Sequence, residues 1–308
     1  RSCQQRTFLM GNEVYSCMER DKPVVHASNA ALLRRLADRG LLKSPAVHAA
    51  MLSVDRANYA PTNAYQDAPQ PIGHAATISA PHMHAHSLEL LAEHLQPGCR
   101  ALDVGCGSGY LCACMARMVG PTGQVVAIDR VPELVELAHR NLAADGELLS
   151  SGTLKVMQGE GWQGFEALAP YDAIHVGAAA AAVPLALQEQ LRRGGRMVIP
   201  VGTQSQEFLQ IDKGLDGTLR TQTLMPVRYV PLVRPAGLEE RPGRGLAADS
   251  SPDAAQGAPA PPAAASAAAG EAAGGASTAT CTGREEDLLA AKVTGMNLSS
   301  SKAAPRAV

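Results

Sequence analysis

The sequence has few aromatic residues and no excess of charge of either sign. Aromatic residues make up 3% of the 308 residues, whereas hydrophobic residues make up 46%. We therefore expect a sizeable core that is mainly aliphatic. The formal net charge of −2 gives no general attraction to nucleic acid or to an anionic membrane, so neither is expected as a partner. No apolar run is long enough to span a bilayer.

The cysteines lack the spacing of a disulfide framework. There are seven of them, an odd number, and the N-terminal stretch has no apolar core of secretory type. Both features predict reduced thiols and a cytoplasmic (cytosolic) protein. Cys112 and Cys114 lie in YLCACMARMVG, which predicts a buried helix with diverging side chains there, so core positions are expected and not a metal or redox pair.

The chain divides into three zones by composition. Residues 1–27 predict an irregular N-terminal extension, and residues 28–233 predict one folded domain. No aromatic residue follows Tyr229, and residues 234–308 are rich in Ala, Pro, Gly and Ser. That low-complexity composition predicts a disordered C-terminal tail.

Strand and helix patterns alternate through the middle of the folded domain. The expected strands are RALDVG, GQVVAID, GTLKVMQG, YDAIHVG and GRMVIPVG, and the expected helices between and beside them are YLCACMARMVG, VPELVELAHRNLAAD and PLALQEQL. Such repeats predict an α/β fold with a doubly wound, mostly parallel, Rossmann-like sheet. The stretch from Glu207 to Leu232 has no helix pattern and predicts antiparallel strands at the edge, with a turn at Gly214 to Gly217.

Helices are also expected before this sheet. SNAALLRRLADRG begins with the capping residue Ser28, and SPAVHAAMLSV begins with Ser44 followed by Pro45 at the first helical position. The turn-rich stretch DRANYAPTNAYQDAPQPIG predicts a long ordered loop, and Pro81 begins a helix through HMHAHSLELLAEHL. These elements place His82, His84 and His86 near the start of a helix.

A glycine-rich turn joins the first expected strand to its helix in ALDVGCGSGYL. Gly105, Gly107 and Gly109 allow positive φ and a close backbone approach to a ligand. The spacing is not the G-x-G-x-x-G of dinucleotide folds, and Asp103 just before the loop would repel a pyrophosphate. A cationic ligand suits the carboxylate, and S-adenosyl-L-methionine carries a sulfonium and an ammonium without a phosphate.

Two further acids follow the next strands. VVAIDR ends in Asp129, which suits two ribose hydroxyls, and QGEGW brings Glu160 and Gly161 to the position of an adenine. The carboxyl ends of parallel strands share one edge, where open α/β sheets bind ligands. The sequence therefore predicts an S-adenosyl-L-methionine site at this edge.

With these motifs in place, the chain resembles the protein-L-isoaspartate (D-aspartate) O-methyltransferases over about residues 28–232. The most specific segment is ATISAPHMHA, whereas the glycine motif alone indicates only a methyltransferase. Further matching segments are VDRANYAPTNAYQDAPQPIG, VVAIDR, YDAIHVGAAA, GGRMVIPVG and VRYVPL. The resemblance implies a monomeric class I methyltransferase that uses S-adenosyl-L-methionine and releases S-adenosyl-L-homocysteine.

The implied activity is repair of aged proteins and peptides. Such an enzyme methylates the free α-carboxylate of L-isoaspartyl and D-aspartyl residues. The ester then closes to a succinimide without the enzyme, and the succinimide hydrolyses partly to normal aspartate. The damaged proteins and peptides are therefore the expected partners.

The resemblance also implies roles for individual residues. The cofactor contacts that it implies are Ala76, Thr77, Ile78, Ser79, His84, Ser108, Asp129, Arg130, Glu160 and Gly161. Ser79 matches the active-site serine, and Arg228 and Val230 of VRYVPL match the part that pairs with the substrate backbone. The sequence departs from the family pattern at Glu160, where Asp is usual, and at Val233, where Thr is usual.

The chemistry of the acceptor suggests what Ser79 does. A carboxylate is ionised well below pH 7, so no strong base is needed. A hydroxyl at Ser79 can hold that carboxylate and orient one oxygen toward the reactive methyl group.

Two other interpretations concern metals and adaptors. His82, His84 and His86 would align only on an extended strand, and a helix disperses them, so no metal site is expected. His48, His94, His139 and His175 are interpreted as ordinary helix or strand residues. The alternative function is a catalytically weak methyltransferase-like adaptor that binds damaged proteins, for which the tail offers only EEDLLAAKV as a docking helix.

Overall fold

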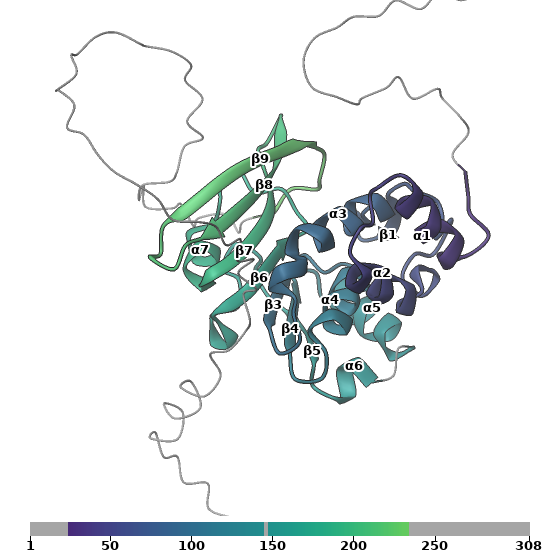
Figure 1. Ribbon diagram of the computed structural model, residues 1–308, viewed down its shortest axis with the longest axis horizontal. Helices are drawn as coiled ribbons and strands as arrows, with labels where there is room; N and C mark the ends of the chain where they lie inside the picture. The colour runs from purple at the N-terminus through teal and green to yellow at the C-terminus, as the bar shows by residue number, and fades with distance from the viewer. Residues whose placement is uncertain (1–23, 145–146, 234–308) are drawn as a thin grey trace, which may run out of the picture.

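The computed structural model describes residues 24–144 and 147–233, and its centre is a seven-stranded sheet (Figure 1). The strand order is β5-β4-β3-β6-β7-β8-β9. The first five strands in this order run parallel, and β8 and β9 add antiparallel pairs. The strands are β3 (Arg100–Val104), β4 (Gln124–Asp129), β5 (Leu154–Gln158), β6 (Tyr171–Val176), β7 (Leu191–Val201), β8 (Gln206–Lys213) and β9 (Leu219–Val227). The predicted mostly parallel, doubly wound fold is confirmed.

Helices cover both faces of this sheet. Those on one face are α1 (Asn29–Asp38), α2 (Pro45–Ser53), α3 (Pro81–Leu91), α4 (Tyr110–Val119), α5 (Pro132–Ala143) and the short α6 (Glu147–Ser150). The other face carries α7 (Leu185–Gln190) and the 3₁₀ turn η3 (Glu166–Leu168). Two more 3₁₀ turns are η1 (Arg56–Asn58) and η2 (Ala92–His94). Ser28 caps α1 through its side chain, as predicted, whereas the Ser44 side chain donates to Glu89 and leaves α2 uncapped.

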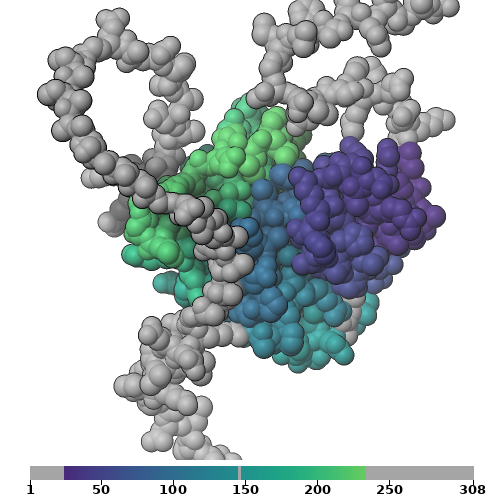
Figure 2. All heavy atoms as spheres, viewed as in Figure 1, coloured from purple at the N-terminus to yellow at the C-terminus, as the bar shows by residue number. Residues whose placement is uncertain are grey.

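The two faces of the sheet follow from the alternation of side chains along each strand. Ala101 faces the cluster under α2 and α4, whereas Leu102 and Val104 face the cluster under α7. The buried core is mainly aliphatic, as the composition predicts, and Phe208 is its only buried phenylalanine among the described residues. In the space-filling view, the purple N-terminal helices and the green β8–β9 segment lie on opposite sides of the blue central part (Figure 2).

A small β-hairpin stands where the sequence predicts only a loop. Strands β1 (Gln70–Gly73) and β2 (Ala76–Ile78) pair antiparallel. His74 and Ala75 between them have φ of 51° and 56°, as a tight primed turn requires. The sequence lacks the Asn-Gly or Asp-Gly that usually marks such a turn, so the hairpin was not predicted.

Other predictions need correction or lie outside the described residues. VRYVPL is not a continuous strand, because β9 ends at Val227 and only Pro231 makes a bridge, to Ala179. Cys99 is disulfide-bonded, so the expectation of reduced thiols is wrong for that residue, whereas Cys106, Cys112 and Cys114 are free. The predicted tail and docking helix, and most of the predicted N-terminal extension, lie outside the described residues.

Candidate active site

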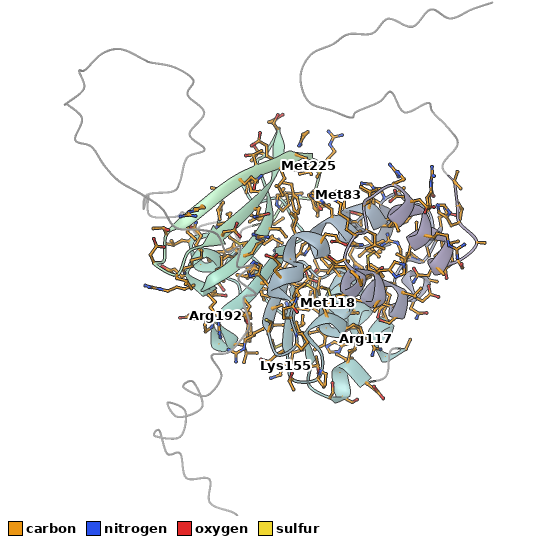
Figure 3. The ribbon with its side chains drawn as sticks, in the orientation of Figure 1. Met83, Arg117, Met118, Lys155, Arg192 and Met225 are labelled. Atoms are coloured by element: carbon orange, nitrogen blue, oxygen red, sulfur yellow. The ribbon has the colours of Figure 1, made fainter. Side chains whose placement is uncertain are left out.

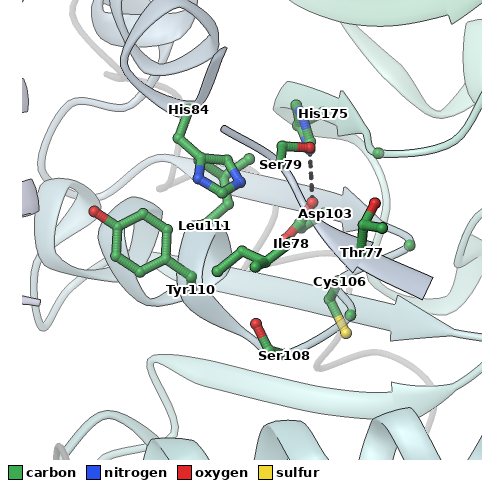
Figure 4. Close-up of a pocket in the computed structure, with 13 residues that line it drawn as sticks. Thr77, Ile78, Ser79, His84, Asp103, Cys106, Ser108, Tyr110, Leu111 and His175 are labelled. Carbon is green, nitrogen blue, oxygen red and sulfur yellow. Dashed lines mark hydrogen bonds and ion pairs between the residues drawn. The ribbon is translucent and has the colours of Figure 1, made fainter. Parts of the chain in front are cut away.

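Three adjoining hollows lie at the carboxyl ends of the parallel strands. The wide cavity has a volume of about 300 Å³ and follows β3, β4, β5 and β6. The acceptor groove, of about 380 Å³, lies between the start of α3 and the residues after β9. Between them is the small cavity, of about 40 Å³ (Figure 4). Thr77 and Gly177 line all three hollows, so the hollows form one continuous site.

The glycine loop, which follows β3 from Gly105 to Gly109, forms the wall of the wide cavity next to the sheet. The N–H groups of Gly105 and Cys106 both donate to the Ile128 carbonyl, at 2.8 and 3.1 Å. Gly105 and Gly107 have φ of 76° and 52° and line the cavity. Gly109 differs from the prediction, because it lines none of the three hollows and an added Cβ would lie 3.3 Å from Ala138 of α5. Gly109 therefore packs against α5, and its φ of 91° at the start of α4 also favours glycine.

Asp129 lies at the end of β4 and lines the wide cavity, as does Arg130. Its carboxylate accepts hydrogen bonds from the N–H groups of Gly107 and Val131, both at 3.1 Å. Burial raises the pKa of Asp129, and these backbone donors oppose the rise. The Asp129 side chain therefore lines the cavity and also stabilises the conformation of the glycine loop.

The edge after β5 is lined by glycine backbone. Gly161 lines the wide cavity, and a Cβ there would lie 2.7 Å from both Leu232 and Val104, so only glycine fits. Glu160 is not among the lining residues, although its Oε2 atom is buried without a hydrogen-bond partner. The predicted cofactor contact of Glu160 is therefore not part of the cavity lining, whereas that of Gly161 is.

Asp103 and His175 form a buried pair in the small cavity. Their side chains are 1% and 7% exposed, and His175 Nδ1 lies 2.8 Å from Asp103 Oδ1, the contact drawn in Figure 4. Asp103 Oδ2 is buried and has no partner. The interpretation of His175 as an ordinary strand residue is wrong, since only the pairing of β3 with β6 brings it beside Asp103.

The segment from Ala76 to Ser79 forms the wall opposite the glycine loop. Ala76 and Thr77 line the wide cavity, and Ile78 and Ser79 line the small cavity. Ser108 also lines the small cavity and is 2% exposed. The predicted segment and the glycine loop therefore do meet across one hollow.

His84 reaches the small cavity from α3 and is held by a residue that the sequence did not single out. The Arg56 guanidinium lies 3.1 Å from His84 Nδ1 and donates to the Ser79 carbonyl at 2.7 Å. Burial lowers the pKa of His84 well below 6.5, and Arg56 lowers it further. In the sequence, Arg56 was marked only by its position in VDRANYAPTNAYQDAPQPIG, a stretch that resembles the family.

Ser79, Arg228 and Val230, for which substrate binding is expected, line the acceptor groove together, and so does Tyr229. The Tyr229 hydroxyl is hydrogen-bonded to the Ser79 side chain, and burial raises the pKa of Tyr229 to about 12. Its ring stacks on Phe208 with centroids 6.3 Å apart. Met83 and Met225 lie close together at this groove, which both of them line (Figure 3).

Of the other two histidines near the start of α3, His82 lines the acceptor groove, whereas His86 lines none of the three hollows. His82 Nδ1 lies 2.8 Å from Asp67, and the His86 ring contacts Phe208 at a centroid distance of 6.1 Å. Across the described part of the chain, no three His, Cys, Asp or Glu side chains gather in a way that holds a metal ion. Within residues 24–144 and 147–233, no helix has the length and apolarity needed to cross a membrane.

Comparison with known proteins identifies the family. The family model for protein-L-isoaspartate (D-aspartate) O-methyltransferase (PCMT) matches residues 27–237. The protein-L-isoaspartate O-methyltransferase of Triticum aestivum is 50% identical over 217 residues, which cover 69% of this chain and 94% of the relative. The enzyme of that name from Caenorhabditis elegans is 49% identical over 209 residues, which cover 67% and 92%.

A solved structure shows the same arrangement of elements. The Plasmodium falciparum β-aspartate methyltransferase (PCMT), crystallised with S-adenosyl-L-homocysteine, aligns with a TM-score of 0.64 and 37% identity. The alignment covers 68% of this chain and 99% of that one. The glycine loop, the acids at the strand ends and the ATISAPHMHA segment thus belong to a chain that is a member of the protein-L-isoaspartate (D-aspartate) O-methyltransferase family of S-adenosyl-L-methionine-dependent enzymes.

Proposed function

We propose that the protein transfers a methyl group from S-adenosyl-L-methionine to the free α-carboxylate of L-isoaspartyl and D-aspartyl residues in aged proteins and peptides. The observation that carries this proposal is the position of Ser79, which lines both the small cavity and the acceptor groove. An acceptor group in the groove can therefore face a donor group that lies across the small cavity.

The residues of the wide and small cavities fit this cofactor. Asp103 lines the small cavity, and its Oδ2 is a buried acceptor without a partner among the described residues, as a ligand with donor groups and a positive charge requires. Among the residues that the structure describes, Arg130 and His74 are the only basic ones that line the wide cavity, so these residues form no basic cluster there. The cofactor supplies an electrophilic methyl group on its sulfonium.

Individual roles follow from these surroundings. Asp129 accepts hydrogen bonds from the ribose hydroxyls, and Arg130 lies beside it. Asp103 attracts the positive groups of the cofactor, and His175 keeps its carboxylate oriented through the 2.8 Å contact. Main-chain groups approach the ligand next to Gly105 and Gly107, whose φ values are positive, and next to Gly161, where a Cβ would meet Leu232 and Val104.

The acceptor side uses hydroxyl groups instead of a base. Ser79 donates to the acceptor carboxylate, and Tyr229 holds the Ser79 hydroxyl in position. Burial raises the pKa of Tyr229 to about 12, so the phenol stays protonated at neutral pH. Arg228 and Val230 line the groove beside the substrate backbone. Main-chain pairing there would admit many peptide sequences, because it reads little side-chain information.

The decisive experiment compares two peptides that differ in one linkage. A peptide with L-isoaspartate should accept labelled methyl groups, and the same peptide with normal aspartate should not. A second pair tests D-aspartate against L-aspartate. Equal labelling of the isoaspartyl and normal peptides, or no labelling while S-adenosyl-L-homocysteine binds, would contradict the proposal.

We also propose that the protein acts as a cytosolic monomer without nucleic acid or membrane partners. Support comes from the small net charge of −2 and from exposed large apolar side chains that come from separate elements. Light scattering at several concentrations, together with fractionation of cells, tests these statements. A concentration-independent dimer or a membrane-bound fraction would contradict them.

A further inference from the structure

Arg56 is a buried cation beside the active site. It comes from η1 and is 0% exposed. Its guanidinium donates to the Ser79 carbonyl at 2.7 Å, contacts His84 Nδ1 at 3.1 Å and lies 5.3 Å from the centre of the Tyr110 ring. Burial lowers the pKa of Arg56 to about 10, so the side chain remains charged at neutral pH.

This charge has no carboxylate in direct contact. Among the described residues, no Asp or Glu oxygen forms an ion pair with Arg56, and the attraction of Asp67 acts over a longer distance. A buried cation without an anion is costly, and structures keep one chiefly where it has a further use. Here its two strong contacts are to residues that line the small cavity, Ser79 and His84.

The contact with Arg56 determines the tautomer of His84. A guanidinium can only donate hydrogen bonds, so His84 Nδ1 must be the acceptor. The proton of the neutral ring then lies on Nε2. Since Nδ1 is occupied, Nε2 is the nitrogen left for a ligand in the small cavity, into which the ring reaches over Tyr110 (Figure 4).

The small cavity therefore has two ends of opposite polarity. Arg56 and the His84 donor make one end attractive to an anion, and Asp103, with its unpartnered Oδ2, makes the other attractive to a cation. A zwitterionic amino acid group matches this pattern. The cofactor carries such a group, whereas the acceptor contributes only a carboxylate.

We propose that Arg56 is a positioning residue that fixes His84 as the Nε2–H tautomer, so that His84 donates to the carboxylate of the amino acid group of the cofactor. Arg56 also fixes the main chain of Ser79 through its carbonyl. This inference rests on the proposed function for the identity of the cofactor. The alternative source of the carboxylate is the acceptor peptide, and the binding experiment below separates the two.

The tautomer is tested without any catalytic activity. In ¹⁵N NMR of the histidine-labelled protein at pH 7, the His84 ring should show a protonated Nε2 and an unprotonated Nδ1. His86, which lines none of the three hollows, is the matched control and should keep its spectrum in Arg56 variants. A protonated Nδ1, or a ring protonated on both nitrogens at pH 7, would overturn the proposal.

Binding distinguishes the two sources of the carboxylate. Arg56→Met should weaken S-adenosyl-L-homocysteine binding about tenfold, the effect expected for one hydrogen bond to a charged group. It should leave the affinity for methylthioadenosine, which lacks the amino acid group, within twofold. Unchanged affinity for both ligands with a raised KM for the peptide would assign the carboxylate to the acceptor and overturn the proposal.

Two variants guard against a loss of fold. Arg56→Lys keeps the charge but cannot hold both Ser79 and His84, so it should show a smaller loss of S-adenosyl-L-homocysteine affinity. Arg196, which pairs with Asp212 and donates to the Leu90 carbonyl, offers a matched control, because Arg196→Met should leave both affinities unchanged. If Arg56→Met does not fold, the S-adenosyl-L-homocysteine affinity of Arg56→Lys and the His84 tautomer in the wild-type protein test the proposal instead. Failure of peptide methylation with these binding results intact would count against the proposed function alone.

Discussion

The two sides of the active site are built in different ways. The cofactor side is made of backbone at the ends of parallel strands, with Asp129 tied to the N–H groups of Gly107 and Val131. The acceptor side is made of side chains, with Arg56 and Tyr229 holding the carbonyl and the hydroxyl of Ser79.

The difference shows which side tolerates substitution. The sheet fixes the main chain of the cofactor side, so an atom that a substitution adds there must displace main-chain atoms. The acceptor side depends on a few hydrogen bonds, each of which contributes about 1 kcal/mol. Steric changes on the cofactor side should therefore have larger effects than hydroxyl deletions on the acceptor side.

The largest effect is expected for Gly177→Ala, at the point where the three hollows meet. The new Cβ would lie 2.9 Å from the Gly105 carbonyl oxygen, so the glycine loop must shift. A displacement of about 1 Å in a reacting site lowers kcat/KM by about a hundredfold. Initial rates with an isoaspartyl peptide measure the loss. Gly40→Asn, in open space after α1, is the control, and equal losses in both variants would remove Gly177 from this role.

A smaller effect is expected for Asp129→Asn. The variant keeps an oxygen for the backbone N–H groups but loses the charge that attracts ribose hydroxyls. Hydrogen bonds to charged groups contribute about 1.5–3 kcal/mol, so S-adenosyl-L-homocysteine should bind about ten- to a hundredfold more weakly. Calorimetry measures this affinity. Asp216→Asn, in the exposed β8–β9 turn, serves as the control, and a matching loss there would show an effect of net charge.

Smaller still are the effects on the acceptor side. Ser79→Ala should lower peptide kcat/KM about tenfold, and Tyr229→Phe about threefold, with cofactor affinity unchanged in both. Because the two hydroxyls share a hydrogen bond, the double variant should lose less than the product of the single losses. Strict multiplication of the two effects would show that Tyr229 acts independently of Ser79.

The smallest expected effect is on the pH dependence of stability, to which His84 and Asp129 contribute with opposite signs. Burial and then Arg56 lower the pKa of His84, so the unfolded state binds more protons below pH 6.5 and stability falls as the pH drops from there. Burial raises the pKa of Asp129, so this carboxyl opposes the loss at acidic pH. His84→Gln should flatten the decline by at most about 1.4 kcal/mol per pH unit, and Asp129→Asn should steepen it. Urea unfolding from pH 7 to pH 4 measures both, and parallel curves would exclude this difference.

Sequence reasoning predicts the cofactor side well because its residues are neighbours in short motifs. Asp103, the glycines and Asp129 stand at strand ends that periodicity locates, and the carboxyl edge then unites them. Gly109 is the exception, since its position within the motif does not reveal that it faces α5.

The residues that hold Ser79, His84 and Asp103 are less predictable, because their contacts join distant parts of the chain. Arg56, His175 and Tyr229 belong to no local motif, and only tertiary packing brings them to Ser79, His84 and Asp103. A histidine in a buried strand is ordinary until the partner strand supplies a carboxylate. The β1–β2 hairpin was missed for a related reason, as its turn is imposed by packing on residues that do not favour it.

The small cavity makes the site a narrow junction between two larger chambers. With about 40 Å³, it has room for only a few atoms, so little water fits between the two chambers once both are filled. The donor can then lose its methyl group only to an atom delivered from the opposite chamber. While a peptide fills the acceptor groove, each molecule of cofactor spent should accordingly correspond to one damaged residue methylated.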